Sequence, residues 1–444
     1  MLDKVKNFGS GLANKVTAKA KEVNTKVAAK HPTKEADDQY IVGLDIGTEF
    51  VKALIGRVKG DSIEIIGVGR AHQELSDMQA GAIADIGRVV ENCDNALARA
   101  EEQAGVSART AVIGIAGELV KGTTTTVRVT RKTPDKPLDL VEVERIIKLV
   151  QSRAEAKAKH QLAWELGGKD VEVRLVNSAL VGIEIDGYKV TSPIGFQGRD
   201  VVVQLYTAFA PLIHIGALER TAQQLDLDLL AVAAEPFAVA RSVIGNDANA
   251  SMSAILMDIG GGTTDIAVIN DGGVQGTKMF GIGGRAYTRS IERDLGIEFG
   301  QAEEFKIALS ENRLPEPKVA AIEGALGKTL DVWISGVELA LGEFDKLDNL
   351  PHRLLLCGGG SSLDMLIDEL TKSDWYTRLP FTRKPIVQHI QPEQVVGIVD
   401  KTGDVNDHTF ITAMGLLRVG LDTLQFSAGP GATLKDKLDR ILKV

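Results

Sequence analysis

The chain has 444 residues, of which 44% are hydrophobic and 25% are charged, so it has enough apolar material for two or three ordinary domains. The net charge of −9 argues against a nucleic-acid-binding protein, because affinity for phosphate backbones comes mainly from clustered Lys and Arg. The two cysteines, Cys93 and Cys357, exclude a disulfide framework and a Cys-rich metal site, and they suit a reducing cytoplasm. No apolar run approaches the roughly 20 residues that a membrane-spanning helix needs.

Charge is unevenly distributed, with basic ends on an acidic body. Residues 1–30 carry a local charge of +5 and residues 434–444 one of +2, which leaves −16 for the rest of the chain. An anionic membrane would repel the acidic body, so attachment to such a surface must come from the ends. Apolar residues within 1–30 recur mostly at three- and four-residue steps, as in a helix, and a polar linker follows. We therefore predict a basic amphipathic arm over residues 1–39.

Strand and helix patterns alternate after this arm, which is typical of an α/β protein. In chain order, the patterns predict a strand from residue 40, a helix over 85–103, a buried strand over 110–115, an exposed strand over 123–130, a helix over 138–164, two strands over 171–176 and 181–190 that flank a possible hairpin, and helices over 211–225 and 235–244. We interpret residues 118–206, where the exposed strand, the long helix and the paired strands follow one another, as an inserted α+β subdomain.

Two strings about half a chain apart share one pattern. Residues 42–48 and 256–264 each contain an apolar strand that ends in Asp-Ile-Gly, followed by a small polar turn and a second strand. Glycines in such a turn let the backbone approach a ligand closely and present N–H groups that suit phosphate. Asp45 and Asp258 can hold Mg²⁺, usually through water. We predict that the two hairpins face one another and clamp a metal–polyphosphate, with an ordinary Asp turn as the alternative for Asp45.

A third glycine cluster, Gly358-Gly359-Gly360, follows the predicted buried strand 354–357. Ser361 and the residues after it look like the start of a capped helix. A strand–glycine–helix unit is a common geometry for ligand approach at the ends of α/β sheets. We predict that this cluster receives a nucleoside.

The order of these motifs resembles that of the actin-like ATPase superfamily. Residues 45–48 match its first phosphate motif, residues 258–265 the second, residues 358–360 the adenosine motif, and Glu235-Pro236 and residues 413–415 its two connecting motifs. The resemblance covers about residues 40–424. It implies an α/β, actin-like fold in which two RNase H-like domains flank a nucleotide cleft.

Within this superfamily the chain most resembles the FtsA family of bacterial cell-division proteins, because of its second phosphate string and its inserted subdomain. This resemblance implies ATP and Mg²⁺ as cofactors. The residues that it assigns to the nucleotide are Gly47, Thr48, Gly260, Gly261, Gly262, Thr263, Thr264, Gly284, Glu303, Lys306, Gly358, Gly359, Gly360 and Ser361. It assigns Asp45 and Asp258 to Mg²⁺, with water between the carboxylate and the ion in both cases.

Two positions leave hydrolysis open. Glu235 matches the position where related ATPases polarise the attacking water, with an ordinary Glu-Pro helix start as an equal alternative. The first phosphate turn of the family commonly continues Thr-Ser-Lys, whereas here it reads Thr48-Glu49-Phe50. A carboxylate beside a triphosphate is unfavourable unless Mg²⁺ or a base offsets it. We therefore expect Glu49 to point away from the ligand, and weak ATP hydrolysis or none.

The resemblance also divides the chain into segments. The predicted segments are the arm 1–39, a first actin-like domain over 40–117 and 207–250, the inserted subdomain 118–206, a second actin-like domain over 251–424 with a subdomain at about 301–348, and a tether with a C-terminal amphipathic helix over 425–444.

The C-terminal segment has the pattern of a short membrane-surface helix. Leu434, Leu438, Ile441 and Leu442 share one helical face, and the basic residues lie mostly elsewhere. Docking of this helix back onto the protein is the alternative. The N-terminal arm would be a second weak anchor or a solubilising tail.

The FtsA resemblance implies a cytoplasmic, ATP-binding protein that polymerises on the cytoplasmic face of the cell membrane at the division site and anchors the FtsZ ring there. Its expected partners are the FtsZ C-terminal tail, further copies of itself, the anionic membrane surface and later divisome proteins, but no nucleic acid. One alternative is a PilM-like component of a type IV pilus assembly platform, suggested by Val51-Lys52 after the first turn. A small-molecule kinase is another, although no catalytic Asp for an acceptor hydroxyl can be assigned.

Overall fold

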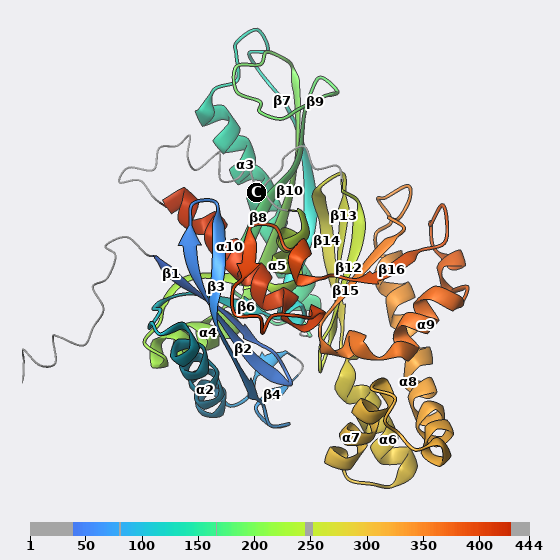
Figure 1. Ribbon diagram of the computed structural model, residues 1–444. Helices are drawn as coiled ribbons and strands as arrows, with labels where there is room; N and C mark the ends of the chain where they lie inside the picture. The colour runs from blue at the N-terminus through green and yellow to red at the C-terminus, as the bar shows by residue number, and fades with distance from the viewer. Residues whose placement is uncertain (1–38, 80, 166, 245–251, 428–444) are drawn as a thin grey trace, which may run out of the picture. The chain divides into compact units, whose positions relative to one another are not determined.

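Aliphatic runs bounded by glycine turns form two large mixed β-sheets in the computed structural model, which describes residues 39–79, 81–165, 167–244 and 252–427 (Figure 1). The first sheet has the strand order β11-β6-β1-β2-β3-β17. Its strands are β1 Tyr40–Ile46, β2 Phe50–Lys59, β3 Ser62–His72, β6 Thr110–Ile115, β11 Asp228–Ala234 and β17 Ile398–Asp400. A separate small hairpin consists of β4 Met78–Gln79 and β5 Ala82–Ile83.

The second sheet has the order β16-β15-β12-β13-β14-β7-β10-β8-β9. Its strands are β7 Lys121–Thr130, β8 Val173–Ile185, β9 Tyr188–Val190, β10 Asp200–Pro211, β12 Ala254–Ile259, β13 Thr264–Asn270, β14 Gly273–Phe280, β15 Arg353–Cys357 and β16 Ile386–His389. Its β14-β13-β12-β15-β16 portion repeats the β3-β2-β1-β6-β11 order of the first sheet, with antiparallel hairpins on one side and parallel strands on the other. The predicted doubling of one supersecondary unit is therefore confirmed.

Two central helices join these two halves. α5 (Glu235–Ile244) packs against β12 and β13, α10 (Ile411–Ser427) packs against β1, β2 and β6, and the two helices contact each other (Figure 1). At this crossing, Arg241 Nη2 lies 2.7 Å from an Asp422 carboxylate oxygen, and Arg418 Nη2 lies 2.8 Å from the other. All three side chains are buried, so breaking one of these pairs would leave an uncompensated charge.

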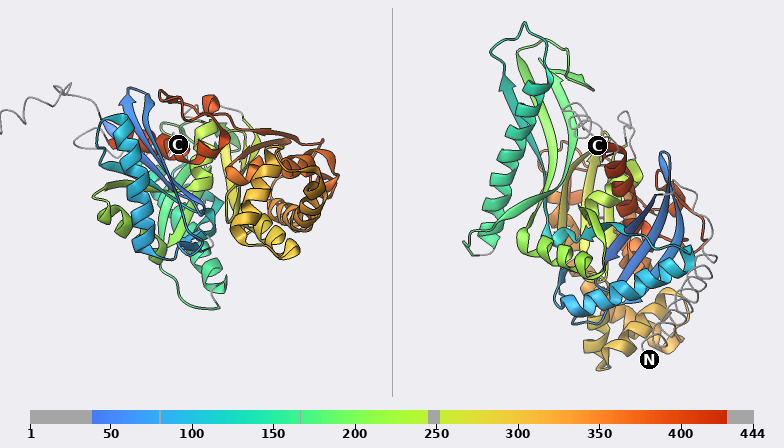
Figure 2. Two further views of the ribbon diagram at one scale, coloured as in Figure 1. Left: turned by 60° about the horizontal axis from the view of Figure 1, so that its bottom comes forward. Right: turned by 90° about the vertical axis from the view of Figure 1, so that its left-hand side faces the viewer.

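Of the remaining helices, α2 (Ile86–Ala104) covers an outer face of the first sheet and packs on β2 and β3, as the left view of Figure 2 shows. Its first turn is capped by the Asp85 carboxylate, which accepts from Arg88 N at 3.2 Å, and it ends at Gly105 in the left-handed conformation. The other helices are α3 Leu140–Glu165, α4 Leu212–Gln224, α6 Gly284–Leu295, α7 Phe299–Ser310, α8 Glu316–Gly342 and α9 Asp364–Lys372. Of these, α6 and α7 pack against α8 and each other.

The part of the chain interpreted as an insert has its own apolar core. α3 packs against β7 and β10, and its buried face includes Val143, Ile147 and Val150 (right view of Figure 2). The sheet of the insert is continuous with the second half, because Gly276 of β14 pairs with Thr123 of β7. Next to this pair the Thr124 hydroxyl donates to the carbonyl of Val274 at 2.7 Å.

Two local predictions were wrong. The strand expected over 171–176 and the first half of the one expected over 181–190 form one continuous strand, β8, because the polar residues in its middle pair with β10 instead of turning. Residues 188–190 form the separate strand β9. The hairpin turn lies at Asp186-Gly187, where both residues have positive φ angles of 49° and 87°. The expected side-chain cap of α9 is also absent: its N-cap residue is Leu363, since the Ser361 hydroxyl donates instead to the Gly358 carbonyl at 2.7 Å.

None of the helices in the described ranges combines the length and the apolar character that a bilayer-spanning helix requires.

Candidate functional site

A cavity of about 340 Å³ lies where the edges of the two halves meet. Its walls come from the β1–β2 turn, the β12–β13 turn, the starts of α5 and α6, one side of α7, and the glycine turn after β15. A volume of this size is in the range of small-molecule sites, and sheet ends joined by glycine turns are where α/β proteins bind ligands.

The two hairpin turns face one another across this cavity, as predicted. Gly47 N donates to Phe50 O at 3.2 Å in the first turn, and Gly260 N donates to Thr263 O at 2.9 Å in the second. The approach is close, because a Cβ added to Gly262 would lie 3.0 Å from the hydroxyl oxygen of Thr48. Backbone N–H groups at the tips of both turns therefore border the same space, which suits an anion.

Behind the turns lies a group of buried carboxylates with one lysine. Lys52 Nζ lies 3.0 Å from an Asp45 carboxylate oxygen, because the β1–β2 register sets these two residues opposite each other. The β12–β13 register likewise pairs Asp258 with Asp265. Glu235 completes the group from the first turn of α5.

Negative charge is in excess here, and the pKa values reflect it. Burial raises the pKa of Glu235 well above its ordinary value, and the carboxylates of Asp45, Asp265 and Asp258 raise it further against the opposing effect of Lys52. Burial also raises the pKa of Asp265 well above its ordinary value, with Asp258 as the next cause. The pKa of Asp258 is raised by burial and lowered by a hydrogen bond from the Thr412 hydroxyl.

The carboxylate group fits a hydrated divalent cation. Asp265 Oδ1 is buried and has no hydrogen-bond partner among the described residues. Within those residues no three His, Cys, Asp or Glu side chains converge into a direct metal site. Mg²⁺ keeps much of its water shell and binds one or two carboxylates together with phosphate oxygens, so it does not require such a direct site.

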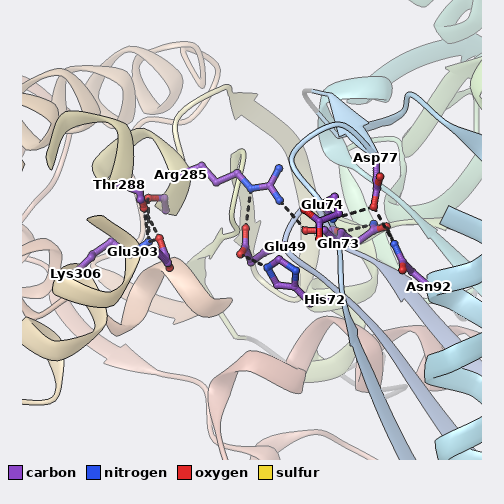
Figure 3. Close-up of polar contacts among 12 residues, drawn as sticks. Glu49, His72, Gln73, Glu74, Asp77, Asn92, Arg285, Thr288, Glu303 and Lys306 are labelled. Carbon is purple, nitrogen blue, oxygen red and sulfur yellow. Dashed lines mark hydrogen bonds and ion pairs between the residues drawn. The ribbon is translucent and has the colours of Figure 1, made fainter. Parts of the chain in front are cut away.

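One side of the cavity is formed by α6 and α7, where a lysine is held in place by three acceptors. Lys306 Nζ donates to the Glu303 carboxylate at 2.7 Å, to the Thr288 hydroxyl oxygen at 2.8 Å and to the Gly284 carbonyl at 3.2 Å (Figure 3). The Glu303 carboxylate also accepts from the Thr288 hydroxyl. A carboxylate and an ammonium fixed side by side at a cavity wall can bind the hydroxyl and ring groups of a polar ligand.

The glycine turn after β15 lies against the second hairpin. Gly358 has φ +81° and ψ 155°, and a Cβ added there would be 2.1 Å from Asp258 Oδ1. A Cβ on Gly360 would be 2.7 Å from Ile259. Gly359, in contrast, is exposed and has nothing within 4 Å of its Cβ position, so it presents open backbone to the cavity.

The cavity brings together most of the residues that the sequence assigned to a ligand. Those that line it are Asp45, Gly47, Thr48, Glu235, Asp258, Gly260, Gly261, Thr263, Gly284, Glu303, Lys306, Gly358, Gly359 and Gly360. Gly262, Thr264 and Ser361 are not in its lining. The Thr264 hydroxyl faces the core, where it donates to the Ile282 carbonyl at 2.7 Å and accepts from Trp333 Nε1 at 2.9 Å.

Glu49 lies in the cavity wall, contrary to the expectation that it points away. Its carboxylate accepts from Arg285 Nε at 2.7 Å, and His72 Nε2 lies 2.9 Å from its other oxygen (Figure 3). Arg285 thus supplies the base that offsets the carboxylate. Sequence reasoning missed both Arg285 and Arg70, another cavity residue, which stacks over the Phe50 ring with Cζ 3.5 Å from the centroid. The one available signal was the position of Arg285 directly after Gly283-Gly284.

The predicted membrane residues Leu434, Leu438, Ile441 and Leu442 lie outside the described residues, as does the arm over 1–38.

Comparison with known sequences finds similarity to bacterial cell-division proteins. The family model "Cell division protein FtsA" matches residues 255–415, which include the second hairpin, α7 and the glycine turn after β15. The FtsA protein of Pseudomonas aeruginosa is 26% identical over 414 residues, covering 86% of this chain and 89% of that protein. The FtsA protein of Bacillus subtilis is 26% identical over 273 residues, covering 61% of this chain and 58% of that protein.

Among solved structures, that of a PilM–PilN type IV pilus biogenesis complex is similar, with a TM-score of 0.61 and 16% identity, covering 86% of this chain and 98% of that one. At this identity the likeness concerns the fold alone. The sequence matches, by contrast, confirm the resemblance drawn from the motifs. The chain is accordingly similar in sequence to the FtsA cell-division proteins, with a family match over residues 255–415, and it has a mixed α/β, actin-like fold.

Proposed function

We propose that this protein binds Mg²⁺·ATP in the cavity between its two halves and acts as a nucleotide-dependent, actin-like protein in cell division. The observation that supports nucleotide binding is the convergence of both glycine hairpin turns, the Glu303–Lys306 pair and the glycine turn at 358–360 on one cavity. Each element alone is common, but together they provide an anion cradle, polar groups for a sugar and an open backbone for a base.

In this proposal each group has a distinct role. The N–H groups of the two turns bind the phosphate oxygens, and Lys52 lies behind them as a positive charge. Asp45 and Asp258 hold the hydrated cation, which supplies charge neutralisation when bound. Glu303 and Lys306 bind the ribose side, and the backbone at Gly359 allows the adenine to approach.

Glu235 is the candidate residue for positioning water, because it enters the cavity from the first turn of α5 beside the proposed cation site. Its raised pKa favours the protonated form, which cannot accept a proton. A bound divalent cation would lower this pKa again, so Glu235 would be able to act as a base only in the loaded site. Hydrolysis is therefore proposed as slow and cation-dependent.

Binding is tested directly with a fluorescent ATP analogue, with Mg²⁺ and with EDTA. We expect saturable binding that Mg²⁺ strengthens, and loss of binding on charge reversal of Lys52, as in K52E. Failure of the wild-type protein to bind the analogue would overturn the proposal.

We further propose that the protein polymerises on the cytoplasmic face of the membrane and anchors FtsZ by binding the C-terminal tail of FtsZ. The support is its homology to FtsA together with the basic amphipathic pattern at residues 434–444. Co-sedimentation with anionic liposomes and FtsZ, with and without ATP, tests this. Removal of residues 1–30 and 434–444 together should abolish liposome binding while nucleotide binding remains, and binding should weaken as salt rises.

A role in type IV pilus assembly is the second candidate. The structural likeness to the PilM–PilN complex motivates it, but the curated sequence relatives favour cell division. The two are separated by peptide binding. Binding to the FtsZ tail supports the division role, whereas binding to a short cytoplasmic peptide of an inner-membrane pilus protein, with no affinity for the FtsZ tail, supports the other.

A further inference from the structure

We propose that Glu49 and Arg285 form a latch across the cavity. This latch holds the β1–β2 turn and the β12–β13 turn together and sets how fast a nucleotide enters and leaves. The name cleft latch is used here for the Glu49 carboxylate and the Arg285 guanidinium. The inference rests on nucleotide binding as proposed above. It adds a kinetic role for two residues that the sequence motifs do not assign.

The cleft latch joins parts of the chain that belong to different halves. Glu49 lies at the tip of the β1–β2 turn, and Arg285 lies in the first turn of α6, 236 residues away. The two are joined by the 2.7 Å contact between Arg285 Nε and Glu49 Oε2. Arg285 Nη2 also lies 3.4 Å from the Gln73 carbonyl, so the guanidinium contacts the first half at two points (Figure 3).

Both partners are held rigidly. On the second half, the Arg285 N–H donates to the Gly261 carbonyl at 2.8 Å, which ties the start of α6 to the second hairpin turn. On the first half, Gln73 N donates to the Glu49 carbonyl at 2.9 Å, and Gln73 Nε2 donates to the Gly47 carbonyl at 2.8 Å. Asn92 in turn donates to the Gln73 side chain at 3.1 Å. Because the backbone is already fixed on both sides, the contact does not have to order a loop when it forms, so more of its energy remains for closure.

Burial distinguishes this pair from an ordinary surface pair. The Arg285 side chain is 11% exposed and the Glu49 side chain 23% exposed. Charge-assisted bonds shielded from water are stronger than exposed ones, which contribute little. The cleft latch lies beside the closest approach of the turns, where a Cβ on Gly261 would be 3.1 Å from the Glu49 Cβ. The turns therefore cannot separate without breaking it.

This geometry predicts how loss of the cleft latch changes the rates of nucleotide association and dissociation. Because Glu49 is neutralised by Arg285, its repulsion of a nearby phosphate is small, and removing its charge mainly removes the cleft latch. The contact holds the two turns against each other, so it opposes both uptake and release. Losing it should therefore raise the association and dissociation rates together, with little change in affinity.

The test is stopped-flow kinetics of a fluorescent ATP analogue with the full chain. For the double variant E49Q/R285Q, which removes the contact and leaves neither charge without its partner, we expect both rates to rise about tenfold, equivalent to about 1.4 kcal/mol, and Kd to stay within about threefold. E49Q and R285Q alone should also raise both rates, with a weaker Kd for R285Q because Glu49 then lacks its base. The charge swap E49R/R285E should return the rates toward wild type. As matched controls, R57Q and E64Q each remove one partner of a half-buried 2.7 Å pair within the first half and outside the cavity lining, and they should change neither rate.

Three results would overturn the inference. If E49Q slows release while R285Q speeds it and weakens Kd, Arg285 is a phosphate ligand that Glu49 opposes. If neither variant changes the rates, the pair has no kinetic role. If each variant lowers the ligand-free melting temperature and the swap rescues only that temperature, the pair is merely structural. Failure of the wild-type protein to bind nucleotide would instead refute the proposed function itself.

Discussion

Two adjacent glycines allow the role of the turn after β15 to be tested with a single methyl group at each position. Gly358→Ala places a Cβ where φ is +81° and ψ is 155°, a region that L-residues rarely occupy, at a cost of about 1–3 kcal/mol. The same Cβ would lie 2.1 Å from Asp258 Oδ1 and 2.6 Å from the Ile259 carbonyl. Relieving such overlaps by local shifts costs about another 1–3 kcal/mol. The expected loss of unfolding free energy is therefore about 4 kcal/mol.

Gly359→Ala is the matched control for stability. Nothing lies within 4 Å of its Cβ position, so we expect its unfolding free energy to stay within about 0.5 kcal/mol of wild type. Because Gly359 lines the cavity, the added methyl should nevertheless weaken nucleotide binding.

The assay for both variants is urea unfolding without nucleotide, read from the midpoint and slope, followed by titration with a fluorescent ATP analogue. A stable Gly358→Ala protein, within about 1 kcal/mol of wild type, would refute the steric reasoning. So would a Gly359→Ala protein that is as destabilised as Gly358→Ala. A Gly359→Ala protein with unchanged affinity would show that the open backbone does not face the ligand.

Three further outcomes follow from buried groups. The pKa of Asp265 is raised in the folded state, so the stability contributed by its protonated form is lost as pH rises through that raised value. In D265N, the melting temperature without ligand should therefore fall less steeply with pH over this window than in the wild type. An unchanged dependence of melting temperature on pH would contradict the raised pKa of Asp265. In E235Q, Mg²⁺-dependent ATP turnover should drop about 100-fold or more in a phosphate-release assay while binding is retained; equal turnover would exclude Glu235. In T264V, the Trp333 N–H loses its acceptor, so the free energy of unfolding measured in urea should fall by about 1–3 kcal/mol. T264S keeps the hydroxyl and should not show this loss. A T264V protein as stable as the wild type would contradict this role for the hydroxyl.

Local pattern was sufficient for the elements that carry the cavity. The Asp-Ile-Gly strings predicted both hairpins, because a glycine turn after an apolar strand fixes register within a few residues. The strand over 110–115 and the helices starting near residues 85 and 235 also agree with β6, α2 and α5. In each case the information lies in neighbouring residues.

What could not be predicted depends on residues that are far apart in the chain. In the sequence, Glu49 is an unfavourable charge beside a phosphate motif, and only the three-dimensional structure shows that Arg285 neutralises it. Thr264 resembles a phosphate ligand in the motif, but Trp333 and Ile282 occupy its hydroxyl. The course of β8 likewise depends on pairing with β10, which overrides the local turn propensity of its central residues.

The pairing of Gly276 with Thr123 has a mechanical consequence. The residues directly before and after the insert belong to the first half, yet a strand of the insert pairs with a strand of the second half. Gly122 makes this seam tight, since a Cβ there would be 2.1 Å from the Thr277 hydroxyl oxygen and 2.4 Å from that of Tyr206. On the other side, the Asn177 side chain of β8 accepts from Ala234 N of β11 at 2.8 Å, so a rotation of one half relative to the other would strain the insert at one of these two contacts. Opening or closing of the cavity would then change the affinity of a protein bound to the far end of the insert, although that protein does not contact the cavity.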